Sequence, residues 1–316
     1  MSLGLVTLGE SMVLLIAEQA GPLREATTFR RHIAGAESNV AIGLRRLGHA
    51  AGWISRLGDD EFGRAVLFRI RGEGVDTTRV IVDPGAPTGV FFRERREIGP
   101  LEVVYYRRGS AATRLCPADL DADYIGAAGF LHLTGITPAL SASCRETVFA
   151  AAEIARSAGV RIVLDPNYRS KLWSADEARA VLLDLAAHCD ILLPGLDEAV
   201  LLTGQAEPEA AARELARLGP TTVVVKLGAL GAVALDGDRL IHAPAAALER
   251  VVDPVGAGDA FAAGLVAGLL GGESIEGALP LAHRCGAQAM TAVGDMEALP
   301  LWEDVAGSSS ATDIRR

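Results

Sequence analysis

The chain has 316 residues, half of them hydrophobic, which is enough to bury the core of a large globular α/β domain. Its net charge of −10 argues against a nucleic-acid surface, which needs clustered Lys and Arg, so small-molecule chemistry is the better expectation. Four cysteines without a Cys-x-x-Cys pair argue against a zinc site or a disulfide framework, and the lack of an export signal or of an apolar run of roughly 20 residues predicts a cytoplasmic protein without membrane insertion.

The first part of the sequence alternates between strands and helices. A strand over 4–8 is followed by a loop and then by a helix that Gly48 ends. Where this helix begins, Asn39 can simply cap the backbone, or Gly35 can admit a sugar whose hydroxyls Asn39 binds. The alternation predicts β-α-β units, which continue with a strand at 53–56, a helix through 62–70 and a strand at 80–82.

Two strand-like segments, 89–96 and 102–108, interrupt this alternation. Gly99-Pro100 between them is a turn signal, so we expect a hairpin beside the main sheet. Side chains alternate along a strand, which places Tyr105 and Arg107 on one face. The hairpin is either an exposed edge with charged residues or a lid on which Arg107 binds a carboxylate of the substrate.

Polar residues follow a buried strand in the second half of the chain, where α/β alternation returns. Asp165, Asn167 and Arg169 lie where open α/β sheets bind ligands, although a turn or a surface ion pair explains them about as well. Glu198 falls in the first turn of a helix, a position that favours any acid. The expected elements are strands at 130–133, 161–164, 190–194 and 222–226, a turn at 227–232 into another strand, and helices over 143–157, 175–188, 196–202 and 275–293.

A loop that leads into a helix occupies 253–261. Gly256 and Gly258 let backbone amides crowd around a ligand, and the helix N-terminus favours an anion, for which phosphate is the expected candidate. Asp259 would repel this anion, so it is either a base that takes a proton from an attacking hydroxyl or a helix-capping acid beside a tight turn. A P-loop motif is absent, and Phe261 stands where a dinucleotide fingerprint would have its third glycine.

The stretch Asp253-Pro254-Val255-Gly256-Ala257-Gly258-Asp259-Ala260-Phe261 resembles the C-terminal signature of the ribokinase-like (PfkB) sugar kinases. The resemblance continues, in the family's order, at 35–41, 56–63, 165–169 and 226–232. It spans nearly the whole chain and favours the base over the capping acid for Asp259. Within the family, Tyr105-Tyr106-Arg107 together with 167–169 is similar to 2-keto-3-deoxygluconate kinases.

The resemblance implies a doubly wound α/β fold, mostly parallel and flanked by helices, with a small β-sheet lid. We expect one domain over 1–306, a lid to which 88–112 contributes, and a disordered tail at 307–316. The implied activity is transfer of the ATP γ-phosphoryl group to a primary hydroxyl of 2-dehydro-3-deoxygluconate, with Asp259 as base and the amides of Gly256, Ala257 and Gly258 stabilising the transferring group. The residues implied for the sugar acid are Gly35, Asn39, Tyr105, Arg107, Arg169 and Asp295. Those implied for ATP are Asn167, Lys226, Leu227, Gly228, Gly231, Gly256, Gly258 and His283.

One departure from the family pattern concerns the metal. Gly195 stands where the family often has Asn, three residues before Glu198, which can still orient water around Mg²⁺ held by ATP. Activation by a monovalent cation such as K⁺ and a dimer formed through the lid are further expectations. Two alternatives stay open: a kinase for a neutral sugar or nucleoside, such as fructose or ribose, and a sugar-acid sensor without catalysis.

Overall fold

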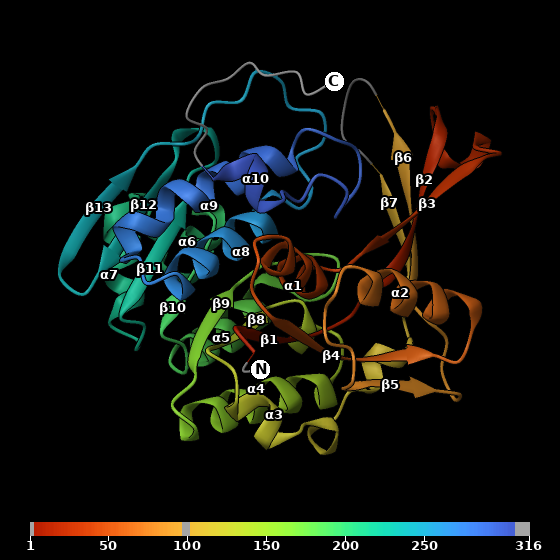
Figure 1. Ribbon diagram of the computed structural model, residues 1–316, viewed down its shortest axis with the longest axis horizontal. Coiled ribbons are helices and arrows are strands. Elements are labelled where there is room, and N and C mark those ends of the chain that lie inside the picture. Colours follow the sequence, from red (N-terminus) through yellow and green to blue (C-terminus); the bar gives the residue numbers. More distant parts are fainter. Residues whose placement is uncertain (1–2, 97–101, 307–316) are drawn as a thin grey trace.

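Within residues 3–96 and 102–306, which the computed structural model describes, the strands form a nine-stranded sheet and a separate four-stranded sheet (Figure 1). The larger sheet has the order β13-β12-β11-β10-β9-β8-β1-β4-β5 and is parallel from β5 to β11, with β12 and β13 antiparallel at one edge. Its strands are β1 (Leu5–Leu8), β4 (Ala51–Gly58), β5 (Val80–Asp83), β8 (Phe130–Thr134), β9 (Arg161–Asp165), β10 (Ile191–Leu192), β11 (Thr222–Lys226), β12 (Ala232–Asp236) and β13 (Arg239–Ala243).

Helices cover both faces of this sheet, as its apolar strands require. Alternate residues of one strand belong to different cores: Leu5 packs on one face, while Val6 and Leu8 pack on the other. The first core takes α1 (Ala36–Arg46), α2 (Glu61–Gly72), α8 (Ala257–Leu270), α9 (Ile275–Ala289) and α10 (Trp302–Val305). The second takes α3 (Ala122–Gly126), α4 (Ala142–Ser157), α5 (Ala175–Ala186), α6 (Leu196–Thr203) and α7 (Pro208–Ala216). Short 3-10 turns are η1 (Leu23–Glu25), η2 (Ala111–Arg114), η3 (Pro117–Asp119), η4 (Thr137–Ala139) and η5 (Gly228–Leu230).

The smaller sheet, which we call the lid sheet, stands at one side of the body (Figure 1). Its order is β3-β2-β6-β7, with β2 parallel to β6 and the other pairs antiparallel. It consists of β2 (Met12–Ala20), β3 (Phe29–Ala34), β6 (Val90–Arg95) and β7 (Val103–Tyr106). The hairpin expected around 89–108 is confirmed by β6 and β7.

The loop expected between the first strand and the first helix is wrong, because this segment forms β2 and β3. Met12, Leu14 and Ile16 pack with Phe91 of β6 in a small core of the lid sheet. The signal was an uninterrupted apolar run at 12–16, which is typical of a strand covered on both faces.

The last long helix also differs from the prediction of 275–293. It ends at Ala289, and the chain then turns through Gly294, whose φ of +126° lies outside helical backbone. The predicted turn at Gly99-Pro100 and the predicted disordered tail lie outside the described residues. The predicted fold class, a doubly wound α/β sheet with a β lid, is confirmed.

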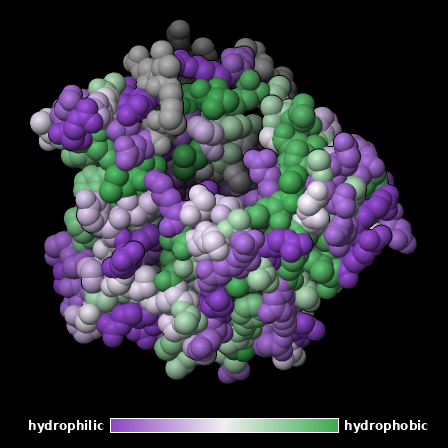
Figure 2. Space-filling model, turned by 180° about the vertical axis from the view of Figure 1, so that it is seen from behind, coloured by the Kyte–Doolittle hydropathy of each residue, from purple (hydrophilic) through white to green (hydrophobic). Residues whose placement is uncertain are grey.

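The face of the molecule behind the view of Figure 1 is mostly hydrophilic. Figure 2 shows purple side chains over much of the face behind Figure 1, with green hydrophobic ones gathered beside a hollow. None of the helices in the described ranges is long and apolar enough to cross a bilayer.

Candidate active site

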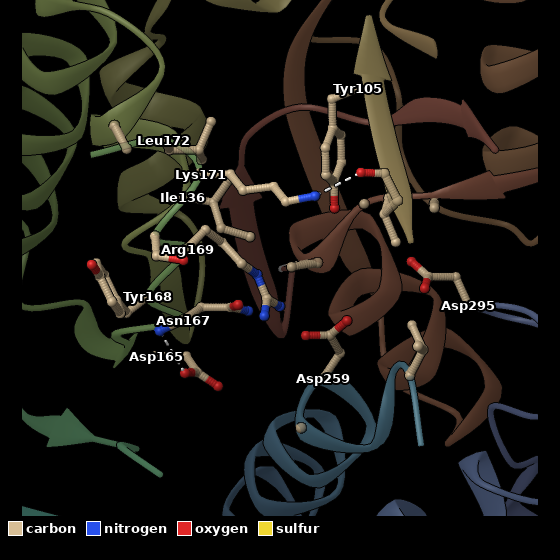
Figure 3. Close-up of a pocket in the computed structure, with 18 of the residues that line it drawn as sticks. Tyr105, Ile136, Asp165, Asn167, Tyr168, Arg169, Lys171, Leu172, Asp259 and Asp295 are labelled. Carbon is tan, nitrogen blue, oxygen red and sulfur yellow. Dashed lines mark hydrogen bonds between the residues drawn. The ribbon is translucent and has the colours of Figure 1, made fainter. Parts of the chain in front are cut away.

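A cavity of about 1850 Å³ lies between the lid sheet and the carboxyl ends of the parallel strands. Sites for one small molecule usually measure about 300–1,000 Å³, so this cavity has room for two ligands. Figure 3 shows Tyr105 reaching in from the lid, Asp165 at the end of β9 with Asn167 and Arg169 after it, and Asp259 at the start of α8. The cavity therefore lies where open α/β sheets bind ligands.

The N-terminus of α8 opens onto this cavity. Gly256 caps the helix with φ of +80°, a left-handed conformation that favours glycine, and a Cβ there would lie 2.5 Å from the carbonyl oxygen of Asp295. Amides in the first turn of a helix have no intrahelical acceptor, so those of Ala257 and Gly258 are free to bind an anion. The ammonium of Lys226 lies beside them, 3.7 Å from where a Cβ of Gly258 would be.

Two carboxylates meet beside this helix end. Asn39 donates one hydrogen bond from Nδ2 to Asp259 Oδ2, at 2.8 Å, and another to Asp295 Oδ2, at 3.0 Å. Burial, reinforced by the charge of Asp295, raises the pKa of Asp259 to about 8, and burial also raises the pKa of Asp295. A carboxyl group with its pKa near neutrality is suited to general-base catalysis. Asn39 does not cap α1, since Gly35 is its N-cap residue.

A second charged group lies at the end of β9 and β11. Lys226 Nζ contacts Asp165 Oδ2 at 2.6 Å. Burial lowers the pKa of Lys226, but the carboxylates of Asp165 and Glu198 outweigh burial and leave that pKa above its usual value. Lys226 therefore stays charged and can attract phosphate. Asn167 adopts a left-handed backbone with φ of 39°, rare outside glycine, at the cavity wall.

Glu198 holds two backbone segments together. Its Oε2 accepts from Gly195 N at 2.7 Å, and its Oε1 accepts from Tyr168 N at 2.8 Å. Burial and the charge of Asp165 raise its pKa. Glu198 is thus the capping acid of α6 and at the same time lines the cavity.

The cations of the cavity differ in their partners. Arg107 is paired with Glu10: Nε donates to Oε2 at 2.7 Å, and Nη2 lies 2.5 Å from the same oxygen. Arg169 makes no ion pair among the described residues, and its guanidinium points toward Asp259 in Figure 3. Lys171 donates to the backbone oxygen of Val103 on β7 at 2.7 Å, which leaves its charge without a carboxylate partner in the described ranges. Arg169 and Lys171 are thus the cations best able to meet an acidic ligand.

Aromatic side chains form the lid side of the cavity. Tyr105 stacks on Phe91 with ring centroids 5.0 Å apart, and both line the cavity. Tyr106, on the opposite face of β7, contacts Phe92. The alternation predicted for this strand is confirmed, and of the two tyrosines of β7 it is Tyr105 that lines the cavity.

Most of the predicted site residues are brought together in this cavity. Gly35 lies against the Glu10–Ser11 backbone, where a Cβ would approach Glu10 O to 2.7 Å. Asn39 touches both acids from behind, while Ala257, Gly231 and His283 are not among the lining residues, and His283 packs edge-on against Phe261. The predicted residues that do line the cavity are Gly35, Tyr105, Arg107, Asn167, Arg169, Glu198, Lys226, Leu227, Gly228, Gly256, Gly258, Asp259 and Asp295.

Sequence reasoning did not single out several charged residues of the cavity wall, among them Glu10, Glu37 and Lys171. Glu37 is fully buried, and burial raises its pKa although Thr134 and Thr137 both donate to its Oε1. Glu10 lies two residues after the end of the first predicted strand, and that position was its signal. Lys171 carries no local signal, because its place depends on the contact with the lid.

The described residues offer no group of three or more metal-binding side chains. Asp165 is already neutralised by Lys226, and Glu198 receives two backbone N–H groups. This donor set does not suit a metal enclosed by protein, but it suits Mg²⁺ that is held by phosphates and contacts one or two carboxylates through water.

Comparison with known proteins gives consistent matches over nearly the whole chain. Residues 3–302 match the family described as pfkB family carbohydrate kinase. A 2-dehydro-3-deoxygluconokinase of Bacillus subtilis is 42% identical over 314 residues, covering 98% of this chain and 97% of the other. A 2-dehydro-3-deoxygluconokinase of Thermoproteus tenax is 41% identical over 304 residues, covering 94% and 91%.

Solved structures agree. A PfkB protein from a Polaromonas species superposes with a TM-score of 0.89 at 38% identity, covering 97% of this chain and 100% of the other. A putative ribokinase from Escherichia coli was solved with ATP and Mg²⁺; it has a TM-score of 0.89 at 28% identity and covers 96% and 98%. A fructokinase from Vibrio cholerae was solved with fructose, ADP and potassium; it has a TM-score of 0.84 at 27% identity and covers 96% and 99%.

Proposed function

Because the chain belongs to the pfkB family of carbohydrate kinases, we propose that it transfers the γ-phosphoryl group of ATP to a primary hydroxyl of a sugar acid, 2-dehydro-3-deoxygluconate. The observation that carries the proposal is the position of Asp259. This acid lies beside the free amides of α8, and the guanidinium of Arg169, which has no ion-pair partner among the described residues, faces it across the cavity. The relatives named 2-dehydro-3-deoxygluconokinase support the choice of sugar acid.

Asp259 acts on the sugar hydroxyl. Its raised pKa makes the carboxylate basic enough to accept a proton from the hydroxyl as that oxygen attacks phosphorus. Asn39 orients the carboxylate by donating to Oδ2, which leaves Oδ1 for the hydroxyl. Asp295, held by the same amide, keeps the pKa of Asp259 high.

The N-terminus of α8 and Lys226 act on the phosphates. Amides of Ala257 and Gly258 lie in the first turn of a helix, so they can stabilise charge on the transferring group. The Lys226 ammonium lies beside Gly258 and adds a positive charge to the same place. Mg²⁺ bound to ATP would neutralise part of the phosphate charge. Glu198 would contact its water shell.

The other end of the cavity recognises the sugar acid. Tyr105 offers an aromatic face and a hydroxyl, and Arg169 and Lys171 offer charges that no carboxylate of the described residues neutralises. A carboxylate on the ligand would complete these pairs, as charge-assisted hydrogen bonds favour. Gly35 lines the same cavity, and its lack of a side chain allows the Glu10–Ser11 backbone to pack against it.

A coupled assay that follows ADP over a panel of sugar acids and neutral sugars tests the proposal. We expect 2-dehydro-3-deoxygluconate to give the highest kcat/KM of the panel. If no sugar or sugar acid of the panel stimulated ATP turnover, the kinase proposal would be overturned. The alternative of a sugar-acid sensor without catalysis would then remain.

One observation favours a second candidate, a kinase for a neutral sugar. Arg107, which we expected to hold the carboxylate, is already paired with Glu10. A cavity wall that carries this neutralised pair can bind hydroxyls instead. Higher kcat/KM for fructose or ribose than for any sugar acid would establish this alternative.

A further inference from the structure

Arg93 is a buried charge that the proposed mechanism does not use. It lies on β6 of the lid sheet, is 5% exposed and lines the cavity. Its Nη2 donates to Asp253 Oδ2 at 2.6 Å. Its Nε and Nη1 are buried without any hydrogen-bond partner in the described structure. Burial of a guanidinium with only one hydrogen-bonded nitrogen lowers the stability of the folded state, so its presence here calls for a role beyond packing.

The partner, Asp253, ties together two segments of the body. Its Oδ1 accepts from Val255 N and its Oδ2 accepts from Gly294 N, each at 3.2 Å. Val255 precedes the glycine that caps α8, and Gly294 precedes Asp295. One carboxylate therefore holds the backbone that leads to the anion-binding amides and the backbone that leads to the second acid.

A second lid contact reaches the same place. His32, on β3, lies with its Nδ1 2.6 Å from Oε1 of Glu297, two residues after Asp295. The lid sheet thus touches the segment around the base from two of its strands. The contacts are polar and directional, so a shift of the lid changes them more than it would change apolar packing.

We propose that Arg93 is a positioning residue: through Asp253 it couples the lid sheet to the backbone at 254–258 and 294–295, so that the lid sets the geometry of phosphoryl transfer. A sugar bound beneath Tyr105 fixes the position of the lid sheet. The hydrogen bond from Arg93 to Asp253 then fixes the position of the loop that precedes α8. Correct alignment of the amides then depends on the sugar being bound. The coupling favours transfer to sugar over transfer to water.

The charge of Arg93 also acts on the acids. Burial is the main cause of the raised pKa of Asp295, and Arg93 opposes it, while Asp253 and Glu297 reinforce it. Burial raises the pKa of Asp259 most; the charges of Asp295 and Asp165 raise it further, and the charge of Arg169 lowers it. Removal of the guanidinium therefore raises the pKa of Asp295 further.

The test compares Arg93→Met, Arg93→Lys, Asp253→Asn and the double variant Arg93→Met/Asp253→Asn. We expect kcat to fall about a hundredfold in Arg93→Met, as for a reacting group misplaced by about 1 Å, while KM for sugar and ATP changes little. Arg93→Lys, which keeps the charge but loses the planar fork, should lose about tenfold. The double variant should be no slower than the slower single one, because both act through one contact.

Arg95→Met is the matched control. Arg95 lies on the same strand, is exposed and donates to the backbone oxygen of Glu18, so it should change kcat less than twofold. Hydrogen exchange gives a readout without substrate: the amides of Val255 and Gly294 should exchange faster in Arg93→Met than in wild type or Arg95→Met.

Should Arg93→Met fail to fold, because Asp253 is left buried and unpaired, Arg93→Lys carries the same comparison. A kcat within twofold of wild type in Arg93→Lys, additive losses in the double variant, or unchanged exchange at Val255 and Gly294 would each overturn the proposal. The kinetic arm rests on the proposed kinase activity. If the wild-type protein is inactive on the whole panel, the kinase activity is refuted but the coupling is not. Hydrogen exchange at Val255 and Gly294 then tests the coupling by itself.

Discussion

The two ends of the cavity are built in different ways. The end that we propose for phosphoryl transfer comes largely from one continuous stretch, 253–259, which supplies a turn, free amides and the proposed base. The sugar end takes Glu10 after β1, Gly35 after β3, Tyr105 from β7 and Arg169 after β9. Backbone amides suffice to bind phosphate and need only local geometry, whereas a particular sugar needs side chains that only the tertiary fold brings together.

The two ends also differ in charge. At the transfer end, burial and a neighbouring acid raise the pKa of Asp259 to about 8. At the sugar end, Arg169 and Lys171 carry charges that no carboxylate in the described residues neutralises. One end is therefore prepared to take up a proton and the other to take up an anion.

Removal of the proposed base should have the largest effect. Asp259→Asn keeps the shape of the side chain and the contact with Asn39 but cannot accept a proton, so kcat should fall by a factor of about 10² to 10⁴. Sugar and ATP should still bind. Initial rates together with calorimetric titration of each substrate check this expectation.

Asp176→Asn, an exposed acid on the first turn of α5 that does not line the cavity, is the matched control and should keep near-normal kcat. A kcat of Asp259→Asn within tenfold of the wild-type value would mean that Asp259 is not the base, and the proposed transfer end would then have no catalytic base of its own.

Loss of a cation at the sugar end should have a smaller effect, confined to acidic substrates. Arg169→Met removes a charge-assisted hydrogen bond worth about 1.5–3 kcal/mol, so KM for the sugar acid should rise about 10- to 100-fold. Neutral sugars should be affected less than about threefold, since they carry no charge to lose. Steady-state kinetics on one acid and one neutral sugar measure the difference.

Arg217→Met serves as the control, because Arg217 is exposed, does not line the cavity and has no side-chain hydrogen-bond partner among the described residues. Equal losses for acidic and neutral sugars in Arg169→Met would mean that this arginine supports the transfer end, toward which its guanidinium points in Figure 3.

The same contrast between local and tertiary features explains which parts of the fold and of the site could be predicted from the sequence. The alternation of strands and helices and the loop at Gly256 depend on local pattern, and both were predictable. The strands β2 and β3 were missed because the apolar run at 12–16 was assigned to a loop. This run forms a stable strand only when it pairs with β3 and β6.

Side-chain pairing across the fold was beyond sequence reasoning. The predicted role of Arg107 could not include Glu10, which lies 97 residues away in the chain. The predicted contact of Asn39 with sugar could not include the two acids that it touches, since these contacts span 220 and 256 residues. Contacts of this length follow from topology, which local periodicity does not encode.

The smallest effect we expect is a gain in stability when the base is removed. The pKa of Asp259 is about 8 in the folded protein, against about 3.9 for an unperturbed Asp. Between these two pH values the folded state holds a proton that the unfolded state has lost, so the free energy of unfolding falls as pH rises from about 4 to about 8 and then levels off. Asp259→Asn does not titrate and escapes this loss.

The melting temperature of Asp259→Asn should therefore exceed that of wild type by more at pH 8.5 than at pH 5. Asp259 is only partly buried, so a difference of about 1 kcal/mol, or roughly 2 °C, is expected. Calorimetry at both pH values measures it, with Asp238→Asn in the exposed turn between β12 and β13 as the control that should show no such change. A gain that is the same at both pH values would mean that Asp259 is ionised throughout this range, and the transfer end would then hold its base as a permanent carboxylate.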